Sequence, residues 1–143
     1  MPVRTGFAVG EGDLLNGKGT VKLGSGAFEG RYSFASRFEE GNGTNPEELI
    51  GAAHAGCFSM ALSHELAQAG HTPKRVSTTA KVHLEKVAEG FKITSIDLNT
   101  EAEIPGIGQD EFQKFAENAK KGCPVSQALS SGIVVNLLAK LIV

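Results

Sequence analysis

The chain has 143 residues, about the length of one ordinary domain, and 41% of them are hydrophobic, which permits a packed core. Its formal net charge of −2 excludes the basic surface that nucleic-acid-binding and membrane-surface proteins need. The opening sequence, MPVRTGFAVGEGD, has no apolar stretch of the kind found in secretory signals. We therefore expect a cytoplasmic protein with a single domain over residues 1–143.

The first 43 residues are predicted to form β structure interrupted by glycine. The expected strands are Arg4–Val9, Thr20–Leu23 and Tyr32–Phe38, and the turns between and after them contain GEGD, NGKG, GSG and GNG. None of these glycine-rich sequences has the strand–loop–helix order of a phosphate-binding loop, so we interpret them as hairpin turns.

A long helix is predicted from Asn45 to Gly70. Asn45 is a suitable N-cap and Pro46 suits the first helical position. The Asn45-x-x-Glu48 spacing is typical of a capping box, and Gly70 suits the C-terminal end.

The middle of this helix is apolar nearly all round. Between Gly51 and Ser63 it has no formally charged residue, but it is rich in Gly, Ala and Ser and is flanked closely by charged residues, so we do not interpret it as a membrane span. A helix of this kind has to be covered on nearly all sides, and one short chain offers few strands to do so. We infer a symmetric dimer.

The second half of the chain is predicted to contain a hairpin, two helices and a last strand. In chain order, the expected elements are the strands Val76–Val87 and Phe91–Ala102, an amphipathic helix over Asp110–Lys121, a short helix from Pro124 to about Ser130 and a strand over Ile133–Val143. A change of apolar phase in the second hairpin strand predicts a β-bulge near Thr94 and Ser95. The fold class is therefore α+β, with mostly antiparallel strands around a central helix.

Cys57 and Cys123 are the two cysteines, and Cys57 lies in the middle of the apolar helix. A buried free cysteine usually packs as a small hydrophobe. Cys57 is too far along the helix to be activated by the helix dipole, and burial would raise the pKa of its thiol. It is therefore either an inert core residue or a thiol that needs a cation brought to it.

Arg37 is the candidate cation, and Glu47 is the carboxylate that would orient it. A guanidinium keeps its proton even in a dry site, and its fork pairs with a carboxylate. At about 100° per residue, Glu47 lies roughly 80° around the helix from Cys57, whereas Glu48 lies on the opposite side. The alternatives are that Arg37 is a solvated strand end and that Glu47 only complements the helix dipole.

Cys123 follows one predicted helix and directly precedes Pro124, which begins the next. A cysteine near a helix N-terminus has a lowered thiol pKa, although a small residue at a helix junction is an equally good interpretation. His54 shares a helix face with Cys57, so a cysteine–histidine pair or a metal site is conceivable. Because zinc needs three or four ligands, we interpret His54 as a packed histidine and expect no metal.

Two segments carry a resemblance to a known family. RFEEGNGTNPEELIGAAHAGCFSMALS (Arg37–Ser63) and AKKGCPVSQAL (Ala119–Leu129) closely resemble the OsmC (osmotically inducible protein C) branch of the OsmC/organic hydroperoxide resistance family. The resemblance extends over nearly the whole chain. It implies an OsmC-like fold, an intertwined homodimer with active sites at the interface, and a thiol-dependent peroxidase that reduces organic hydroperoxides in oxidative and osmotic stress defence.

Residue by residue, the resemblance implies that Cys57 is the peroxidatic cysteine and Cys123 the resolving one, with Glu47 as the glutamate of the family's NPE sequence and Arg37 as the arginine of its RFE sequence. Two positions depart from the family pattern: Gly10 stands where close relatives often have an aromatic residue, and Gly56 stands where alanine is usual.

The resulting hypothesis is a two-cysteine cycle. A Cys57 thiolate held by Arg37 attacks a hydroperoxide and becomes a sulfenic acid, Cys123 closes a disulfide, and an external dithiol reduces it. No metal or organic cofactor is required. The alternative class is a dimeric binding protein whose apolar crevice holds a hydrophobic ligand and whose cysteines only pack.

Overall fold

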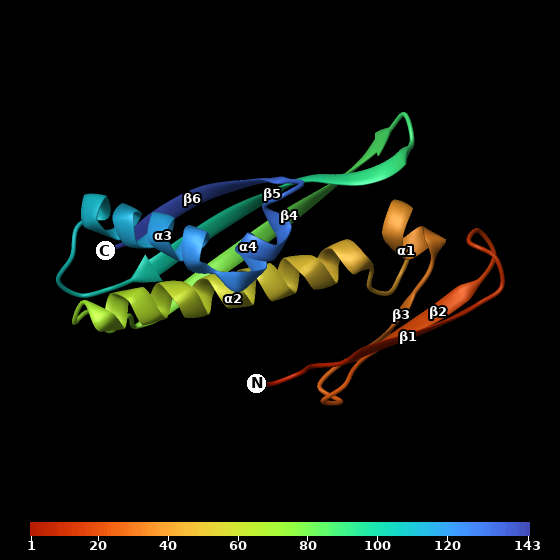
Figure 1. The fold of residues 1–143 in the computed structure, drawn as a ribbon, viewed down its shortest axis with the longest axis horizontal. Helices are drawn as coiled ribbons and strands as arrows, with labels where there is room; N and C mark the ends of the chain where they lie inside the picture. The colour runs from red at the N-terminus through yellow and green to blue at the C-terminus, as the bar shows by residue number, and fades with distance from the viewer. The chain divides into compact units, whose positions relative to one another are not determined.

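The computed structural model describes residues 1–143, which form two compact units, Met1–Leu49 and Ile50–Val143 (Figure 1). The elements are β1 (Gly6–Glu11), β2 (Lys18–Leu23), β3 (Glu29–Tyr32), α1 (Phe34–Phe38), α2 (Pro46–Gln68), β4 (Arg75–Val87), β5 (Gly90–Glu103), α3 (Gln109–Gly122), α4 (Pro124–Leu129) and β6 (Val134–Ile142). The boundary between the units falls one turn into α2. The single domain expected from the sequence stays a prediction.

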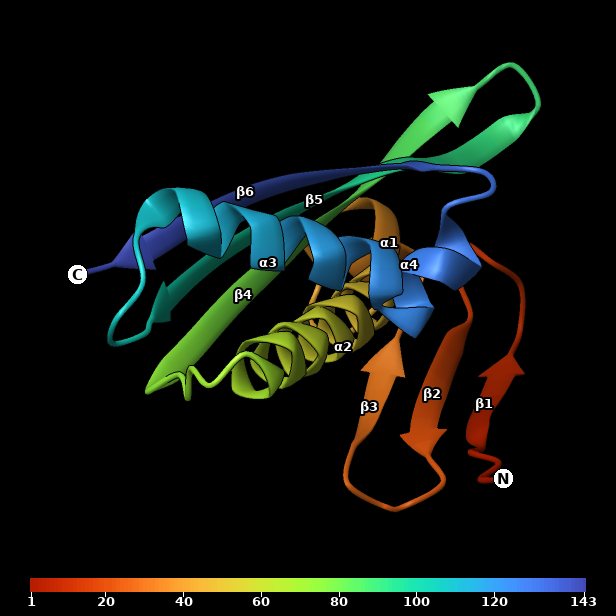
Figure 2. The same ribbon diagram turned by 60° about the vertical axis from the view of Figure 1, so that its left-hand side comes forward.

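The first unit is a three-stranded antiparallel sheet followed by α1 and the first turn of α2. The strands lie in the order β1-β2-β3, side by side in Figure 2. Gly19 of β2 pairs with Tyr32 of β3, and a Cβ on Gly19 would come within 2.1 Å of the Tyr32 ring. Glycine at position 19 is therefore what allows this close contact.

The prediction of a third strand over Tyr32–Phe38 is wrong after its first residue. The chain turns into α1 because Ser33 and Ser36 form a reciprocal capping box: the Ser36 N–H donates to the Ser33 hydroxyl, and the Ser33 N–H donates to the Ser36 hydroxyl. Arg37 therefore lies on a short helix and not at the end of a strand.

The long helix α2 is confirmed, together with most of its predicted end signals. The Glu48 N–H donates to the Asn45 side chain at 2.7 Å, as an N-cap requires. The Glu48 carboxylate accepts a hydrogen bond from the Thr44 hydroxyl at 2.7 Å, so the Asn45–Glu48 capping box is only half present. Gly70 follows the helix with φ +86°, a conformation that glycine adopts without strain.

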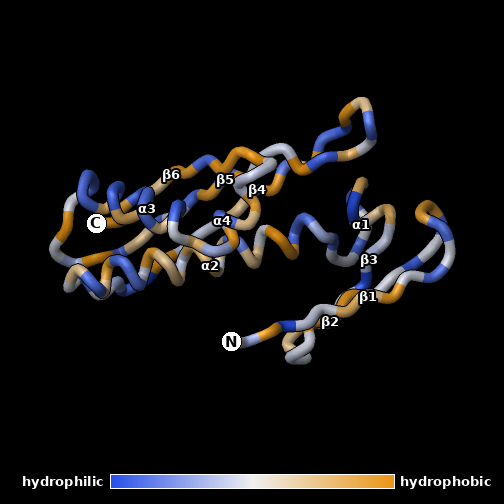
Figure 3. Tube along the Cα trace, viewed as in Figure 1, coloured by the Kyte–Doolittle hydropathy of each residue, from blue (hydrophilic) through white to orange (hydrophobic).

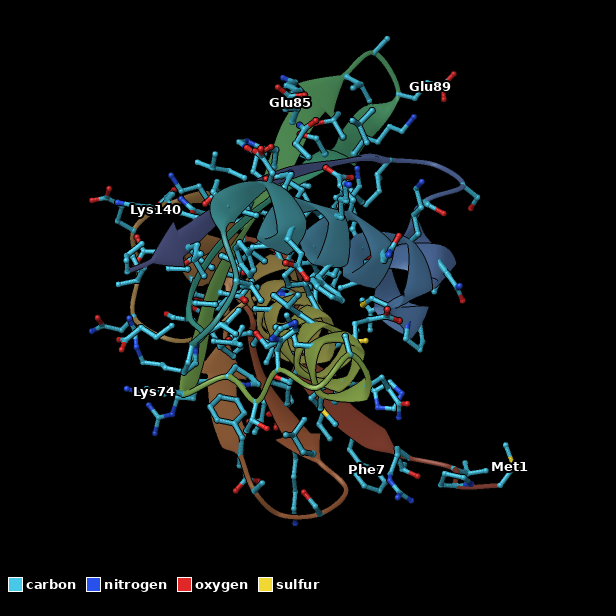
Figure 4. The ribbon with its side chains drawn as sticks, turned by 90° about the vertical axis from the view of Figure 1, so that its left-hand side faces the viewer. Met1, Phe7, Lys74, Glu85, Glu89 and Lys140 are labelled. Atoms are coloured by element: carbon cyan, nitrogen blue, oxygen red, sulfur yellow. The ribbon has the colours of Figure 1, made fainter.

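The second unit contains the sheet β4-β5-β6. β4 and β5 form the predicted antiparallel hairpin, whereas β6 pairs with β5 in parallel. The predicted bulge is confirmed: His83 pairs with Ser95 and Leu84 pairs with Ile93, which leaves Thr94 as the extra residue. Figure 4 shows Glu85 and Glu89 at the far end of this hairpin.

The hydrophobic core lies on one face of this sheet. Phe58, Leu62 and Leu66 of α2 pack with residues of β5, β6 and α3, including Ile96 and Phe112. The predicted amphipathic helix is confirmed as α3, and the short helix after Pro124 is confirmed as α4. Figure 3 shows hydrophobic segments in both units.

The expected α+β class is therefore confirmed. None of the helices combines the length and the hydrophobicity that crossing a membrane requires.

Candidate active site

The two cysteine side chains meet in the second unit. Cys57 lies in α2, and Cys123 is the single residue between α3 and α4. Both are free, and the Cys123 Sγ donates a hydrogen bond to the Cys57 Sγ across 2.9 Å. A disulfide bond is about 2.05 Å long, so an approach of less than about 1 Å would join them.

The two thiols differ in access. Cys123 is completely buried, whereas Cys57 is only partly buried and can be reached from outside the core. An oxidant arriving from solvent therefore meets Cys57 first. Once Cys57 is oxidised, the nearest thiol is the sheltered Cys123.

The surroundings of Cys57 within the second unit favour the protonated thiol. Burial raises its pKa, as do the hydrogen bond that it shares with Cys123 and the proximity of that second thiol, while the backbone of Val125 at the start of α4 lowers it. The helix start that the sequence predicted to activate Cys123 therefore lowers the pKa of Cys57, although burial outweighs this effect. A reactive Cys57 still needs a stronger positive charge.

His54 lies one turn before Cys57 in α2 and is completely buried. Its Nε2 is 2.7 Å from the hydroxyl oxygen of Ser126 in α4, and its Nδ1 has no hydrogen-bond partner. Burial lowers the pKa of the imidazole, which favours the neutral ring. The interpretation of His54 as a packed histidine is confirmed.

Ser126, which contacts His54, was not among the candidate residues predicted from the sequence. Ser126 lies three residues after Cys123, and His54 lies three residues before Cys57. These equal spacings were the sequence signal that could have linked Ser126 with His54. No group of three or more His, Cys, Asp or Glu side chains is placed to bind a metal ion.

The ion pair predicted between Arg37 and Glu47 is present in the first unit. The Arg37 Nη2 donates to the Glu47 carboxylate at 2.7 Å, and its Nε donates to both carboxylate oxygens at 3.1 and 3.2 Å. Glu47 is buried, while the Arg37 side chain remains 36% exposed and lies 5.3 Å from the centre of the Phe38 ring. The guanidinium is thus held in place and still accessible.

The backbone around this ion pair is fixed by short polar contacts. The Ser36 hydroxyl donates to the Thr44 carbonyl at 2.7 Å, and the Asn45 side chain donates to the Ser36 carbonyl at 3.0 Å. These bonds connect α1 to the start of α2, which carry Arg37 and Glu47 respectively.

A mostly apolar cavity of about 210 Å³ borders Arg37 within the first unit. Tyr32, Phe34 and Phe38 contribute aromatic walls, and the segment from residue 10 to residue 14 closes another side. Gly10 lies on this wall without a side chain, and a Cβ there would be 3.2 Å from the Tyr32 hydroxyl. The departure at position 10 therefore leaves this cavity open.

The fold and these side chains define a class of protein: an α+β chain with a partly exposed thiol on a long helix, in contact with a fully buried second thiol. Comparisons with known proteins identify the family. A family model described as OsmC-like protein matches residues 39–138. The chain belongs to the OsmC-like family, as its motifs predicted.

Curated relatives support this assignment. Peroxiredoxin OsmC of Escherichia coli (strain K12) is 51% identical over 138 residues, which cover 96% of each chain. An organic hydroperoxide resistance protein of Xanthomonas axonopodis pv. citri is 34% identical over 98 residues, which cover 68% of this chain and 67% of that one.

Solved structures agree on the fold. An organic hydroperoxide resistance protein OsmC from Legionella pneumophila is 28% identical with a TM-score of 0.74, covering 98% of this chain and 99% of that one. The organic hydroperoxide resistance protein OhrB of Bacillus subtilis, 24% identical, has a TM-score of 0.72 and covers 95% of this chain and 98% of that one.

Proposed function

We propose that this cysteine-based peroxidase reduces organic hydroperoxides to alcohols in oxidative and osmotic stress defence, with Cys57 as the peroxidatic cysteine and Cys123 as the resolving cysteine. The observation that carries the proposal is the contact between one accessible and one buried thiol, 2.9 Å apart. The names of its relatives, peroxiredoxin OsmC and organic hydroperoxide resistance protein, support the same chemistry.

In the first step, the Cys57 thiolate attacks the distal oxygen of a hydroperoxide. The O–O bond breaks, the sulfur is oxidised to a sulfenic acid, and the alkoxide takes a proton to leave as the alcohol. Arg37 supplies the positive charge that the thiolate and the departing oxygen need. Glu47 orients the guanidinium through the bidentate pair.

In the second step, Cys123 attacks the sulfur of the Cys57 sulfenic acid. A disulfide forms and one water molecule leaves. An external dithiol then reduces the disulfide by thiol–disulfide exchange and restores both thiols. We expect this cycle to operate in the cytoplasm, where such dithiols are maintained.

The cavity beside Arg37 supports an organic substrate over hydrogen peroxide. Its aromatic walls can bury an alkyl or aryl group, and each buried methylene contributes about 0.8 kcal/mol. Hydrogen peroxide has no such group and gains nothing from this contact.

We also propose a homodimer. In α2 the exposed residues Ala53, Gly56 and Met60 recur every three or four positions and form one face, and Met60 is 76% exposed. On β1, Phe7 and Val9 lie on one side of the strand and are 56% and 63% exposed. Apolar surface of this kind is typical of an interface.

Single-turnover analysis tests the proposed activity. The fully reduced protein, without any reductant, is mixed with excess cumene hydroperoxide, and the cumyl alcohol is quantified. We expect close to one alcohol per chain, and repeated turnover once dithiothreitol is added. Alcohol formation no faster than with buffer would contradict the proposal, and saturable binding of a hydrophobic ligand would then favour a binding protein.

A further inference from the structure

The geometry points to His54 and Ser126 as a positioning pair that holds the resolving cysteine against the peroxidatic one. The inference rests on the proposed function, since it concerns the step in which Cys123 closes the disulfide. Both residues are buried, so each would act through the position of α4.

Two side-chain contacts join α2 to the start of α4. The Cys123 thiol donates to the Cys57 sulfur at 2.9 Å. Three residues further on, the Ser126 hydroxyl lies 2.7 Å from the His54 Nε2. Cys123 and Ser126, at the start of α4, therefore contact Cys57 and His54, which lie one turn apart on α2.

Unlike the contact between the two cysteines, the hydrogen bond between His54 and Ser126 involves no redox-active group. Both side chains are buried, with exposed fractions of 0% and 4%. A hydrogen bond sheltered from water fixes the distance between its two helices, because breaking it leaves buried polar atoms unsatisfied. The pair therefore restrains the first turn of α4, whose N-cap is Cys123.

Stability alone does not explain a histidine at position 54. Its Nδ1 is buried without a partner, which costs free energy that an apolar side chain of similar size would not. The Nε2, in contrast, forms a hydrogen bond to Ser126 of α4 that an apolar side chain could not form. That nitrogen contacts α4 and, through α4, sets the position of Cys123.

The pair matters after Cys57 has been oxidised. The sulfenic acid adds an oxygen to the Cys57 sulfur in the space between the helices, and Cys123 must stay within reach for attack. If α4 drifts away, the sulfenic acid lasts longer. A second hydroperoxide can then oxidise it to a sulfinic acid with release of a second alcohol, which ends the cycle.

The test compares disulfide formation in the wild type, Ser126→Ala and His54→Leu, which replaces the imidazole by an apolar side chain that cannot bond to Ser126. Each reduced protein is mixed with one equivalent of cumene hydroperoxide, quenched over time with dimedone and a thiol-blocking reagent, and analysed by intact mass. We expect disulfide formation to slow about 3- to 10-fold in each variant, with more dimedone adduct, because one buried hydrogen bond is lost. The double variant should slow no more than the slower single one, since both changes remove the same bond.

Two controls separate positioning from folding. Ser59→Ala removes another hydrogen bond of α2, the one from the Ser59 hydroxyl to Thr78 at 2.7 Å, and should resolve at the wild-type rate. Ser126→Thr keeps the hydroxyl and should restore fast resolution. Ser126→Ala resolving as fast as Ser59→Ala, even with a lower melting temperature, would overturn the inference.

The first step is measured separately in the Cys123→Ser background, where no disulfide can form. Sulfenic acid should still appear at Cys57 there, with or without Ser126→Ala. Its absence even without Ser126→Ala would contradict the proposed peroxidase function and not merely the positioning role, so the two failures are distinguishable.

Discussion

The two units of the molecule differ in where their apolar side chains lie. Every fully buried hydrophobic residue belongs to the second unit, where α2 and α3 cover one face of a sheet. In the first unit the buried side chains are polar, namely Ser36, Thr44 and Glu47, while Phe7 and Val9 are exposed. The second unit therefore contains its own core, whereas the first has apolar surface that one chain leaves uncovered.

The chemistry is divided in the same way. The thiols lie in the unit with the core, so the fold of one chain is sufficient to bring their sulfur atoms within 2.9 Å. The Arg37–Glu47 pair lies in the unit with the exposed sheet. The thiol contact is therefore formed within the second unit, whereas the cation that we propose for thiol activation is held in the first.

The largest expected effect comes from the second unit. Cys57→Ser should lower kcat/KM for cumene hydroperoxide by at least about 10³-fold, because serine is a far weaker nucleophile at neutral pH. Cys123→Ser should keep the first turnover and accumulate a sulfenic acid that dimedone traps. Full activity in Cys57→Ser, with an unchanged circular dichroism spectrum, would refute the assignment.

The first unit should contribute the next largest effect. Arg37→Met should lower the rate of sulfenic acid formation by about 100-fold, because the guanidinium charge that stabilises the reacting oxygens is lost. Arg75→Met is the matched control, because Arg75 forms an exposed ion pair with Glu103 at 3.3 Å and should leave the rate unchanged.

The pH profile of Arg37→Met sharpens this prediction. Burial and Cys123 raise the pKa of Cys57, so without the guanidinium the thiol stays protonated at neutral pH and the rate rises as the solution becomes more basic. The midpoint should lie at higher pH than in the wild type. Identical pH–rate profiles for the two proteins would show that Arg37 does not act on this thiol.

Oligomeric state tests the uncovered surface. Val9→Lys on β1 should raise the dimer dissociation constant at least about tenfold, because an interface core disfavours an unpaired charge. Leu138→Lys is the control: Leu138 is equally exposed, at 63%, but lies on the outer sheet face beside polar residues such as Asn136. Light scattering over a dilution series measures the dimer dissociation constant of both variants. An equal increase of this constant in Val9→Lys and Leu138→Lys would argue against β1 as part of the interface.

The smallest effect concerns α2. Gly56→Ala should stabilise the chain by about 0.5–1 kcal/mol in urea unfolding, because a Cβ there meets nothing within 4 Å and alanine favours helix. Gly51→Ala should not raise the free energy of unfolding in this way, since the added Cβ would lie 3.2 Å from the Ala80 carbonyl oxygen. A destabilising Gly56→Ala in the dimer would mean that the partner chain packs closely there.

Much of the fold was predictable because local signals agree with tertiary structure. The caps of α2 at Asn45 and Gly70, the periodicity of α3 and the phase change at Thr94 all correspond to observed features. The strand predicted over Tyr32–Phe38 failed because two serines, Ser33 and Ser36, cap a helix there, and serine is common enough that the signal was overlooked.

The site was predictable only in part. Opposite charge and helix spacing were sufficient to pair Arg37 with Glu47. The bond from His54 to Ser126 joins residues 72 positions apart and depends on how α4 packs against α2. That contact is not encoded in local sequence, so the structure was needed to find it.

The most direct test of the account is the intact mass and free-thiol count of the reduced protein before and after one equivalent of cumene hydroperoxide, with hydrogen peroxide alongside. We predict the loss of both thiols and of about two mass units per chain, the two hydrogens released when a disulfide forms, with the organic peroxide acting faster. Two free thiols and an unchanged mass with either oxidant would contradict the account, because Cys57 would then be only a core residue.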